Sequence, residues 1–279
     1  MNRNDNLSCA EWERIESAEH DRLYKDSLPF DSTDYKIDPP HVLWWQDYCY
    51  KKGRRPVRGH RTKLAFELMN IHGLGGKTLL DIGCGNGQYS VLFALMGASV
   101  RGIDITTVGI EVASRIAAAN GVADRCLFSV QSAAHLNFED NAFDIVVLHE
   151  ALHHAIKYPG VKAEVLRVLK KGGIAVCTEV LDGNLCFRLA RSFTMRGKEA
   201  KGDVVMTLSE LRDFASGFAS YHLELMSLLF MCKRVLRNQI RYAPVRWFLY
   251  LAKKADDILL GAIPPLRKYC GEAVLVARK

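Results

Sequence analysis

The sequence predicts an α/β fold built on a doubly wound, mostly parallel sheet. Between residues 77 and 180, short apolar runs with strand character alternate with segments of helical periodicity, as in sheets with helices on both faces. Phe143–Leu148 is a nearly continuous apolar run, as expected of a strand covered on both faces. With 279 residues, 49% of them hydrophobic, the chain suits one large α/β domain and excludes a disordered or fibrous protein.

The individual elements follow from apolar runs and from the glycines that end them. In chain order, the expected strands are Thr78–Ile82, Ser99–Ile105, Cys126–Val130, Phe143–Leu148 and Ile174–Val180. The expected helices are Gln88–Met96, Val108–Asn120, which Gly121 ends, and Tyr158–Leu169, which the Lys170–Gly173 turn ends. Further on, we expect a helix over Leu208–Phe214 capped by Thr207, a strand over Tyr221–Phe230, mostly helical structure over 232–263 and a last strand over Gly271–Ala277.

The composition divides the chain into a lid and a main domain. Residues 1–65 are polar and aromatic and broken by prolines, which predicts an N-terminal lid of short helices and loops. Residues 66–279 form the main domain, with a helical cap inserted at about 232–268. The lid aromatic residues either line the substrate wall or pack the lid onto the sheet; the candidates are Tyr24, Trp44, Trp45 and Tyr48.

A glycine-rich turn follows the first expected strand. Its glycines are Gly83, Gly85 and Gly87, whereas a dinucleotide turn needs its third glycine at position 88 and a phosphate-binding loop needs Gly-Lys-Ser/Thr. An acid before the turn, Asp81, suits a ligand that carries an ammonium. Asp104 ends the second strand, where a carboxylate can accept hydrogen bonds from ribose hydroxyls. The turn therefore indicates a nucleoside ligand that carries an ammonium group.

These segments resemble the core of class I S-adenosylmethionine-dependent methyltransferases, especially those that act on small molecules and lipids. The matching motifs are LLDIGCGNG (79–87), VRGIDI (100–105), QSAAHLNFEDNAFD (131–144), VVLHEALHH (146–154) and LRVLKKGGIAV (166–176). The resemblance implies a Rossmann-like sheet with an antiparallel last strand and S-adenosyl-L-methionine as cofactor.

The resemblance also assigns roles to individual residues. It implies that the three turn glycines line the methionine moiety, with Asp81 near its amine, and that His149 lies at the cofactor. Asp104 would hold the ribose, with Ile105 against the adenine. Where the family usually carries an acid that binds the adenine amine, this chain has Gln131, Ser132 and Ala133, of which Ser132 can still accept a hydrogen bond.

Three histidines follow the fourth strand, and the sequence leaves three interpretations open. His149 and His153 are spaced as two ligands on a helix, but we expect no metal. Alternatively, His153 and His154 make structural hydrogen bonds within the helix and fix the loop. As the third possibility, His149 or His153 serves as general base toward a substrate hydroxyl. Candidates farther from the strand end are His41, His60 and His135.

The acceptor is expected to offer an oxygen or an activated carbon. The Asn/Asp-Pro-Pro-Tyr/Phe tetrapeptide of amide- and base-methylating enzymes is missing after the fourth strand, where Leu148, His149 and Glu150 stand instead. We therefore expect a small-molecule, glycan or lipid-like biosynthetic intermediate. An RNA methyltransferase that uses the basic segment 51–63 and an inactive cofactor-fold partner subunit are the alternatives.

The net charge of +7 is unevenly distributed. Segments 51–63 and 232–268 each carry a net +7, which leaves an acidic body and argues against nucleic acid as partner. Residues 241–260 mix bases with aromatic residues, a pattern that suits peripheral contact with a membrane, a lipid-like acceptor, or packing on the sheet. Eight cysteines without a CxxC pair and an N-terminus without an apolar leader favour a cytoplasmic protein. The oligomeric state stays open.

Overall fold

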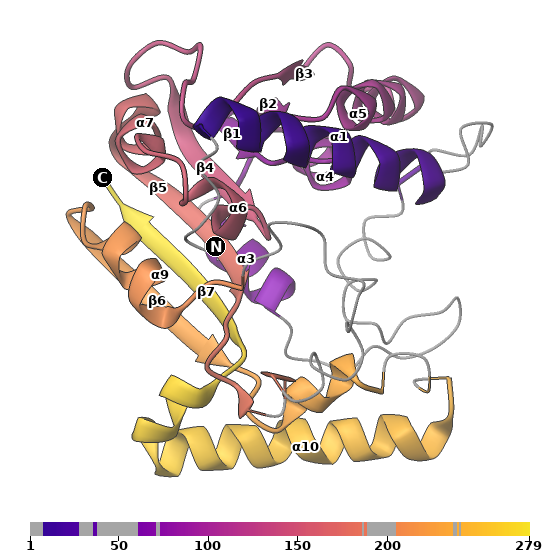
Figure 1. Ribbon diagram of the computed structural model, residues 1–279, viewed down its shortest axis with the longest axis vertical. Coiled ribbons are helices and arrows are strands. Elements are labelled where there is room, and N and C mark those ends of the chain that lie inside the picture. The colour runs from indigo at the N-terminus through magenta and orange to yellow at the C-terminus, as the bar shows by residue number, and fades with distance from the viewer. Residues whose placement is uncertain are drawn as a thin grey trace.

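The sheet has seven strands in the order β3-β2-β1-β4-β5-β7-β6 (Figure 1). The computed structural model describes residues 8–27, 36–37, 61–70, 73–185, 187–188, 205–236, 239 and 241–279. The strands are β1 (Thr78–Ile82), β2 (Ser99–Asp104), β3 (Cys126–Val130), β4 (Phe143–His149), β5 (Leu169–Val180), β6 (Ser220–Met226) and β7 (Glu272–Arg278). β7 runs antiparallel to both β5 and β6, and the other pairs are parallel. The predicted doubly wound sheet with an antiparallel last strand is confirmed.

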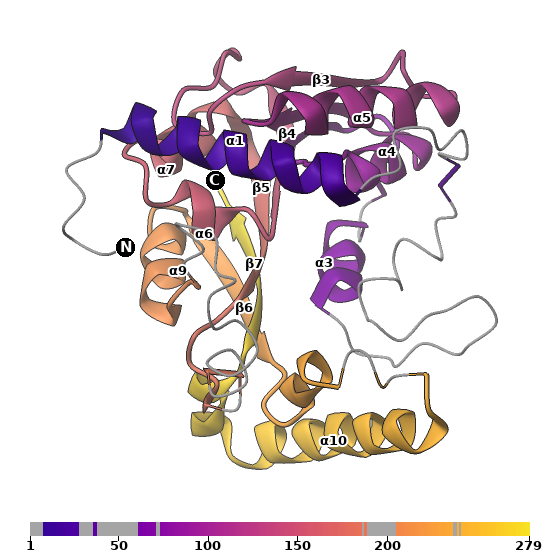
Figure 2. The ribbon, with the colours of Figure 1, turned by 45° about the vertical axis from the view of Figure 1, so that its right-hand side comes forward.

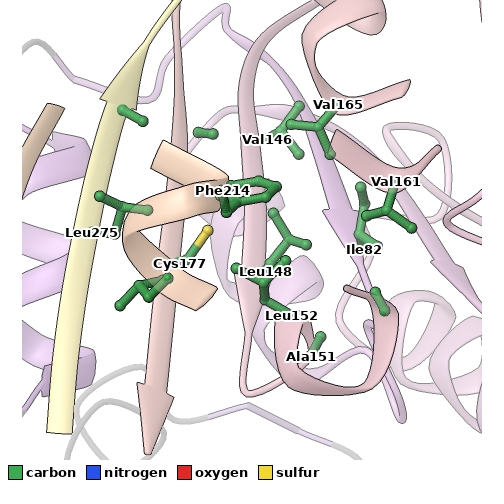
Figure 3. Close-up of a cluster of buried hydrophobic side chains, with 14 of the residues drawn as sticks. Ile82, Val146, Leu148, Ala151, Leu152, Val161, Val165, Cys177, Phe214 and Leu275 are labelled. Atoms are coloured by element: carbon green, nitrogen blue, oxygen red, sulfur yellow. The ribbon is translucent and has the colours of Figure 1, made fainter. Parts of the chain in front are cut away.

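Helices cover both faces of the sheet (Figure 2). One face carries α3 (Arg61–Met69), α4 (Gln88–Leu95) and α5 (Thr107–Ala119), and the other carries α6 (Leu152–Ala155), α7 (Val161–Val168) and α9 (Leu208–Ala215). The residues of β4 alternate between the two layers. Ile145 and Val147 pack under α3–α5, whereas Val146 and Leu148 pack under α6–α9, where Phe214 of α9 lies over the strands (Figure 3). This double burial explains the uninterrupted apolar run of β4.

Several boundaries differ from the sequence predictions for identifiable local reasons. α7 begins at Val161 and not at Tyr158, because Gly160 adopts a left-handed conformation with φ of 98°. β6 ends at Met226 and not at Phe230, because Ser227 has a positive φ of 65°. The segment 170–173, expected to be a turn, belongs to β5. The predicted cap on α9 is confirmed as a capping box between Thr207 and Glu210.

In the predicted helical stretch between β6 and β7, the described residues include η2 (Phe230–Arg234), α10 (Ala243–Ala262) and η4 (Pro264–Tyr269). α10 lies at one end of the molecule in both views (Figures 1 and 2). Within the described ranges, none of the helices combines the length and the apolar character needed to cross a membrane.

The predicted lid is described only in part. Its first helix, α1 (Cys9–Ser27), lies across the strands near α5 (Figure 1). α3 continues through the predicted boundary at residues 65 and 66, so the division into a lid and a main domain stays a prediction. Trp44, Trp45, Tyr48 and the side chain of Tyr24 lie outside the described residues, as do His41, His60 and most of segment 51–63.

Candidate active site

A cavity of about 290 Å³ lies at the carboxyl ends of β1, β2 and β4. This is the edge of a parallel sheet where ligands of α/β proteins bind. Eight of the predicted cofactor residues line it: Asp81, Gly83, Gly85, Asp104, Ile105, Ser132, Ala133 and His149. Gly87 and His153 are not part of the lining. α1 closes one side of the cavity with residues that sequence reasoning did not identify.

Two glycines of the turn after β1 are required by close packing. A Cβ on Gly83 would lie 2.5 Å from the Cβ of Ala151, in the segment that follows β4. A Cβ on Gly87 would lie 2.5 Å from the Cβ of Ala113 in α5. Both residues also have φ near +70°, a conformation in which a side chain is strained. Gly83 thus shapes the cavity, whereas Gly87 starts α4 and allows α5 to approach.

Asp104 joins the ends of β1 and β2. Its Oδ2 accepts a hydrogen bond from the backbone N–H of Gly85 at 2.8 Å. Its Oδ1 accepts from the N–H and the hydroxyl of Thr106 at 3.0 and 2.8 Å. A carboxylate can accept about four hydrogen bonds, and Asp104 already accepts three. One acceptor position therefore remains, on Oδ2. The cavity wall thus offers an acceptor that suits a ribose hydroxyl.

Asp81 is a buried acid at the base of the turn, with 2% of its surface exposed. Ser90 donates a hydrogen bond to its carboxylate at 2.5 Å. Burial raises the pKa of Asp81 to about 7, helped by the charge of Asp104 and opposed by the Ser90 hydrogen bond. A cation entering the cavity would favour the ionised carboxylate, so this residue fits a ligand that carries an ammonium.

α1 is held across the cavity by hydrogen bonds to three neighbouring segments. Ser17 donates to the carbonyl of Ile105 at 2.7 Å, and Asp21 accepts from the N–H of Val108 at 2.9 Å. The hydroxyl of Ser132 donates to the carboxylate of Glu13. Glu13 therefore brings a carboxylate to the segment that follows β3. These two residues are 119 positions apart, and no local pattern in the sequence connects them.

A second acid of α1, Glu16, is buried beside the segment that follows β4. It pairs with Nδ1 of His154 at 2.5 Å, with Lys157 at 3.0 Å and with the hydroxyl of Tyr158 at 2.7 Å. Burial by itself would raise the pKa of Glu16, but these partners lower it to about 2. Glu16, His20 and His154 could place ligand atoms within 4.8 Å of one another, yet Lys157 already neutralises the acid. His154 thus joins α1 to α6.

The two candidate bases face different surroundings. Nδ1 of His149 lies 2.5 Å from the hydroxyl oxygen of Thr178, and its ring contacts Tyr89 with centroids 4.4 Å apart. Burial lowers the pKa of His149 to about 4; nearby Glu150 opposes this shift and Arg61 adds to it. Nδ1 of His153 instead pairs with Glu179 at 2.7 Å. Of these two, His149 is the one at the cavity wall.

Glu150, in the cavity lining, contacts a group of charges in which Arg61, Lys233 and Glu272 are buried. Arg61 pairs with Glu150 and, at 2.5 Å, with Glu272; Lys233 also pairs with Glu272, at 2.7 Å. Arg234 of η2 approaches Glu150 at 3.6 Å. Burial favours the neutral form of Glu150, but Arg61 and the neighbouring cations lower its pKa to about 2. Glu150 is therefore ionised, and its φ of 51° marks a sharp bend after β4.

Comparison with known proteins gives one family match that covers half of the chain. A family model described as a methyltransferase domain matches residues 74–213. Among curated relatives, methyltransferase GfsG of Streptomyces halstedii is 29% identical over 53% of this chain and 53% of its own length. Phthiotriol/phenolphthiotriol dimycocerosates methyltransferase of Mycobacterium leprae is 30% identical over 54% of this chain and 53% of its own. The 27-O-demethylrifamycin SV methyltransferase of Amycolatopsis mediterranei is 38% identical over 35% and 36%.

This chain spans about half the length, or less, of the curated relatives that it matches. Among solved structures, phosphoethanolamine N-methyltransferase 2 of Haemonchus contortus with S-adenosyl-L-methionine has a TM-score of 0.53 at 18% identity, covering 90% of this chain and 61% of its own. The [4+2]-cyclase SpnF has a TM-score of 0.53 at 22% identity, covering 89% and 97%. At such identities the likeness shows the fold alone, and one fold can carry different reactions.

The raised pKa of Asp81 predicts a pH-dependent cost to the stability of the ligand-free protein. Between about pH 4 and pH 7 the folded chain keeps a proton that the unfolded chain has lost, so the contribution of Asp81 to stability falls as the pH rises through this interval. Asp81→Asn should therefore raise the free energy of unfolding, by up to about 4 kcal/mol above pH 7 and by little near pH 4.

Urea unfolding of the ligand-free protein at several pH values measures this difference. Asp124→Asn, at an exposed acid, serves as the control and should change stability equally little at every pH. A gain for Asp81→Asn that is the same near pH 4 and near pH 8 would contradict the assignment.

Proposed function

This chain belongs to the methyltransferase domain family, with S-adenosylmethionine as its methyl donor, and we propose that it methylates an oxygen, or an activated carbon, of a small-molecule, glycan or lipid-like biosynthetic intermediate. The observation that carries this proposal is the place of His149 in the wall of the cavity, where the partly buried imidazole has its pKa lowered to about 4. Such a side chain is neutral at physiological pH and can accept a proton from a substrate hydroxyl.

The residues of the cavity fit the donor at its two ends. Asp104 offers one carboxylate position to a ribose hydroxyl, and Ile105 provides an apolar wall beside it. Asp81, at the glycine turn, meets the requirement for an acid beside the methionine ammonium. When bound, the donor supplies a methyl group that its sulfonium already activates. The protein's task is then to hold the donor and to align the acceptor.

Glu13 supplies a carboxylate for the adenine amine in place of the usual motif acid. Ser132 stands at the position of that acid, and its hydroxyl donates to Glu13. The second oxygen of Glu13 can then accept a hydrogen bond from an amine in the cavity, which Glu13 also lines. The adenine would thus be bound between the end of β3 and α1, so that α1 takes part in donor recognition.

The acceptor is placed at the β4 end of the cavity, near His149, Glu150 and Tyr89. If Nδ1–H of His149 donates to the hydroxyl oxygen of Thr178, Nε2 keeps its lone pair for the proton that an attacking hydroxyl loses. Glu150 is paired with Arg61 and is a weak proton acceptor. The relatives described above are named for rifamycin- and phthiotriol-type acceptors, which supports an acceptor among small molecules or lipids.

The RNA alternative receives little support from the part of segment 51–63 that the structure describes. Arg61 is 3% exposed and bound to two carboxylates, so it is not available to a phosphate backbone. Lys63 pairs with Glu67 on the same helix. The inactive-subunit alternative predicts donor binding without methyl transfer.

Removal of the Asp104 carboxylate should weaken donor binding. Asp104→Ala loses a charged acceptor for the ribose and frees Gly85, so calorimetry with S-adenosylmethionine should show a dissociation constant about 10- to 100-fold higher. Asp124→Ala, at an exposed acid, is the matched control. An unchanged affinity of the Asp104 variant would place the donor elsewhere.

The role of Glu13 predicts a selective loss of adenine recognition. The native protein should bind S-adenosylhomocysteine about tenfold more tightly than its inosine analogue, which lacks the amine, and Glu13→Ala should abolish this preference. Glu19→Ala, on the same helix, should keep it. If Glu13→Ala weakens both nucleosides equally, Glu13 only supports the structure.

His149→Gln should separate methyl transfer from donor binding. We expect the rate of transfer to fall about 100-fold or more, with donor affinity within about threefold of the native value. The rate of the native enzyme should show no inflection near pH 6.5, because the imidazole of His149 is neutral above about pH 5.

The assay follows mass gains of 14 Da in metabolite extracts of a strain that lacks the gene, after addition of enzyme and donor. The 14 Da gain is the mass of one added CH₂, the net change on methylation. His153→Gln should keep most of the transfer rate. The reverse order, with His153 essential and His149 dispensable, would overturn the assignment of the base.

A further inference from the structure

α10 has apolar side chains on two opposite sides. One side packs on the protein through buried residues, among them Leu249, Ala252 and Leu260. On the opposite side Trp247, Leu251 and Ile258 are 65%, 56% and 70% exposed. Spacings of four and seven residues place these three in one row along the helix. We call Trp247, Phe248, Leu251, Lys254 and Ile258 the outer row.

The outer row differs from ordinary scattered exposure of single apolar residues. Phe248 is 53% exposed beside Trp247, and the Tyr250 ring, 47% exposed, contacts Trp247 with centroids 5.9 Å apart. A continuous group of this kind on a helix at the end of the molecule marks a contact surface for another molecule (Figure 2). A surface helix normally carries its apolar residues in a single stripe, and that stripe faces the protein core.

Bases outnumber acids in α10 and the residues that flank it. Residues 241–268 contain six bases and two acids. One of the acids, Asp256, is buried and accepts three backbone hydrogen bonds at the start of η2, and the other, Asp257, pairs with Lys253. The bases are Arg241, Arg246, Lys253, Lys254, Arg267 and Lys268. The segment therefore has a net charge of +4, with Lys254 in the outer row itself, and Arg267 lies 3.5 Å from Glu224.

This charge pattern selects among the partners that an apolar row could have. A second copy of the chain would bring two equally cationic surfaces together, which costs electrostatic energy. A nucleic acid would offer charge but no large apolar surface to the outer row. An anionic lipid bilayer offers both, since its headgroups attract the bases while its interface takes up tryptophan and aliphatic side chains.

We propose that α10 lies in the plane of an anionic membrane surface, with the outer row inserted at the headgroup level. This inference goes beyond the proposed reaction and does not depend on it. α10 is too polar to span a bilayer, so it would bind at the surface, and the Trp247 and Ile258 ends of the row would both be inserted.

The same helix is connected to the acceptor end of the cavity. Asp256 of α10 accepts hydrogen bonds from the backbone of Leu228, Leu229 and Phe230 at 2.7–3.0 Å, which fixes η2 on α10. η2 carries Arg234, which lies 3.6 Å from Glu150 in the cavity lining. A membrane-bound α10 would thus hold the acceptor end of the site close to the lipid surface, where a lipid-like acceptor is found.

Sedimentation with lipid vesicles tests the proposal on the full chain. The native protein should sediment with vesicles of equal parts phosphatidylcholine and phosphatidylglycerol and stay in solution with phosphatidylcholine alone. The double variant Trp247→Ser/Ile258→Ser should lower the partition coefficient about tenfold or more. Lys254→Glu/Lys268→Glu should lower it by a similar factor and reduce its dependence on salt.

Leu127→Ser/Val130→Ser, which removes exposed apolar residues from β3, is the matched control and should bind vesicles like the native protein. Calorimetry with S-adenosylmethionine, unchanged in all variants, shows that they fold and keeps this test separate from the proposed reaction. Failure of the native protein to bind anionic vesicles, or equal loss in the control, would overturn the proposal. Light scattering measures whether the native protein is a dimer. If it is, and if only Trp247→Ser/Ile258→Ser loses the dimer, the outer row contacts a second copy of the chain and not a membrane.

Discussion

The carboxylate of Asp104 holds the turn after β1 against the end of β2, and the rest of the cofactor cavity depends on this contact. One oxygen fixes the N–H of Gly85, and the other fixes the backbone and hydroxyl of Thr106. The turn can come this close only because Gly83 leaves room for Ala151 and Gly87 leaves room for α5. The same contact leaves one carboxylate position directed to a ligand, so one side chain both builds and lines the cavity.

A buried group of charges organises the other end of the site. Arg61 of α3 joins Glu150 at the end of β4 to Glu272 at the start of β7, and Lys233 of η2 shares Glu272. Removing one partner of such a group leaves a buried charge without compensation, at a cost of about 3–5 kcal/mol. The group therefore connects Glu150 to η2 and, through η2, to α10. The proposed donor site beside α1 and the proposed acceptor site near Glu150 share the lining of one cavity.

The parts of this structure that could be predicted from sequence are those set by neighbouring residues. The alternation of strands and helices, the glycine turn and the capping box at Thr207 depend on contacts within a few positions, and the structure confirms all three. The contacts that complete the site were not predictable, because they join distant residues of ordinary type. Glu13 meets Ser132 across 119 positions, and Arg61, which belongs to the basic segment 51–63, meets Glu272 across 211. His149 and His153 were indistinguishable in sequence, and only the partners Thr178 and Glu179 separate them.

We propose that one cavity binds the donor with its ribose at Asp104 and its reacting sulfur toward His149. A crystal structure of the protein with S-adenosylhomocysteine tests this orientation. We predict a ribose hydroxyl on Oδ2 of Asp104, the adenine amine within hydrogen-bonding distance of Glu13, and the sulfur facing the end of β4. A nucleoside bound outside this cavity, or in the reverse direction with its sulfur toward α1, would contradict the account.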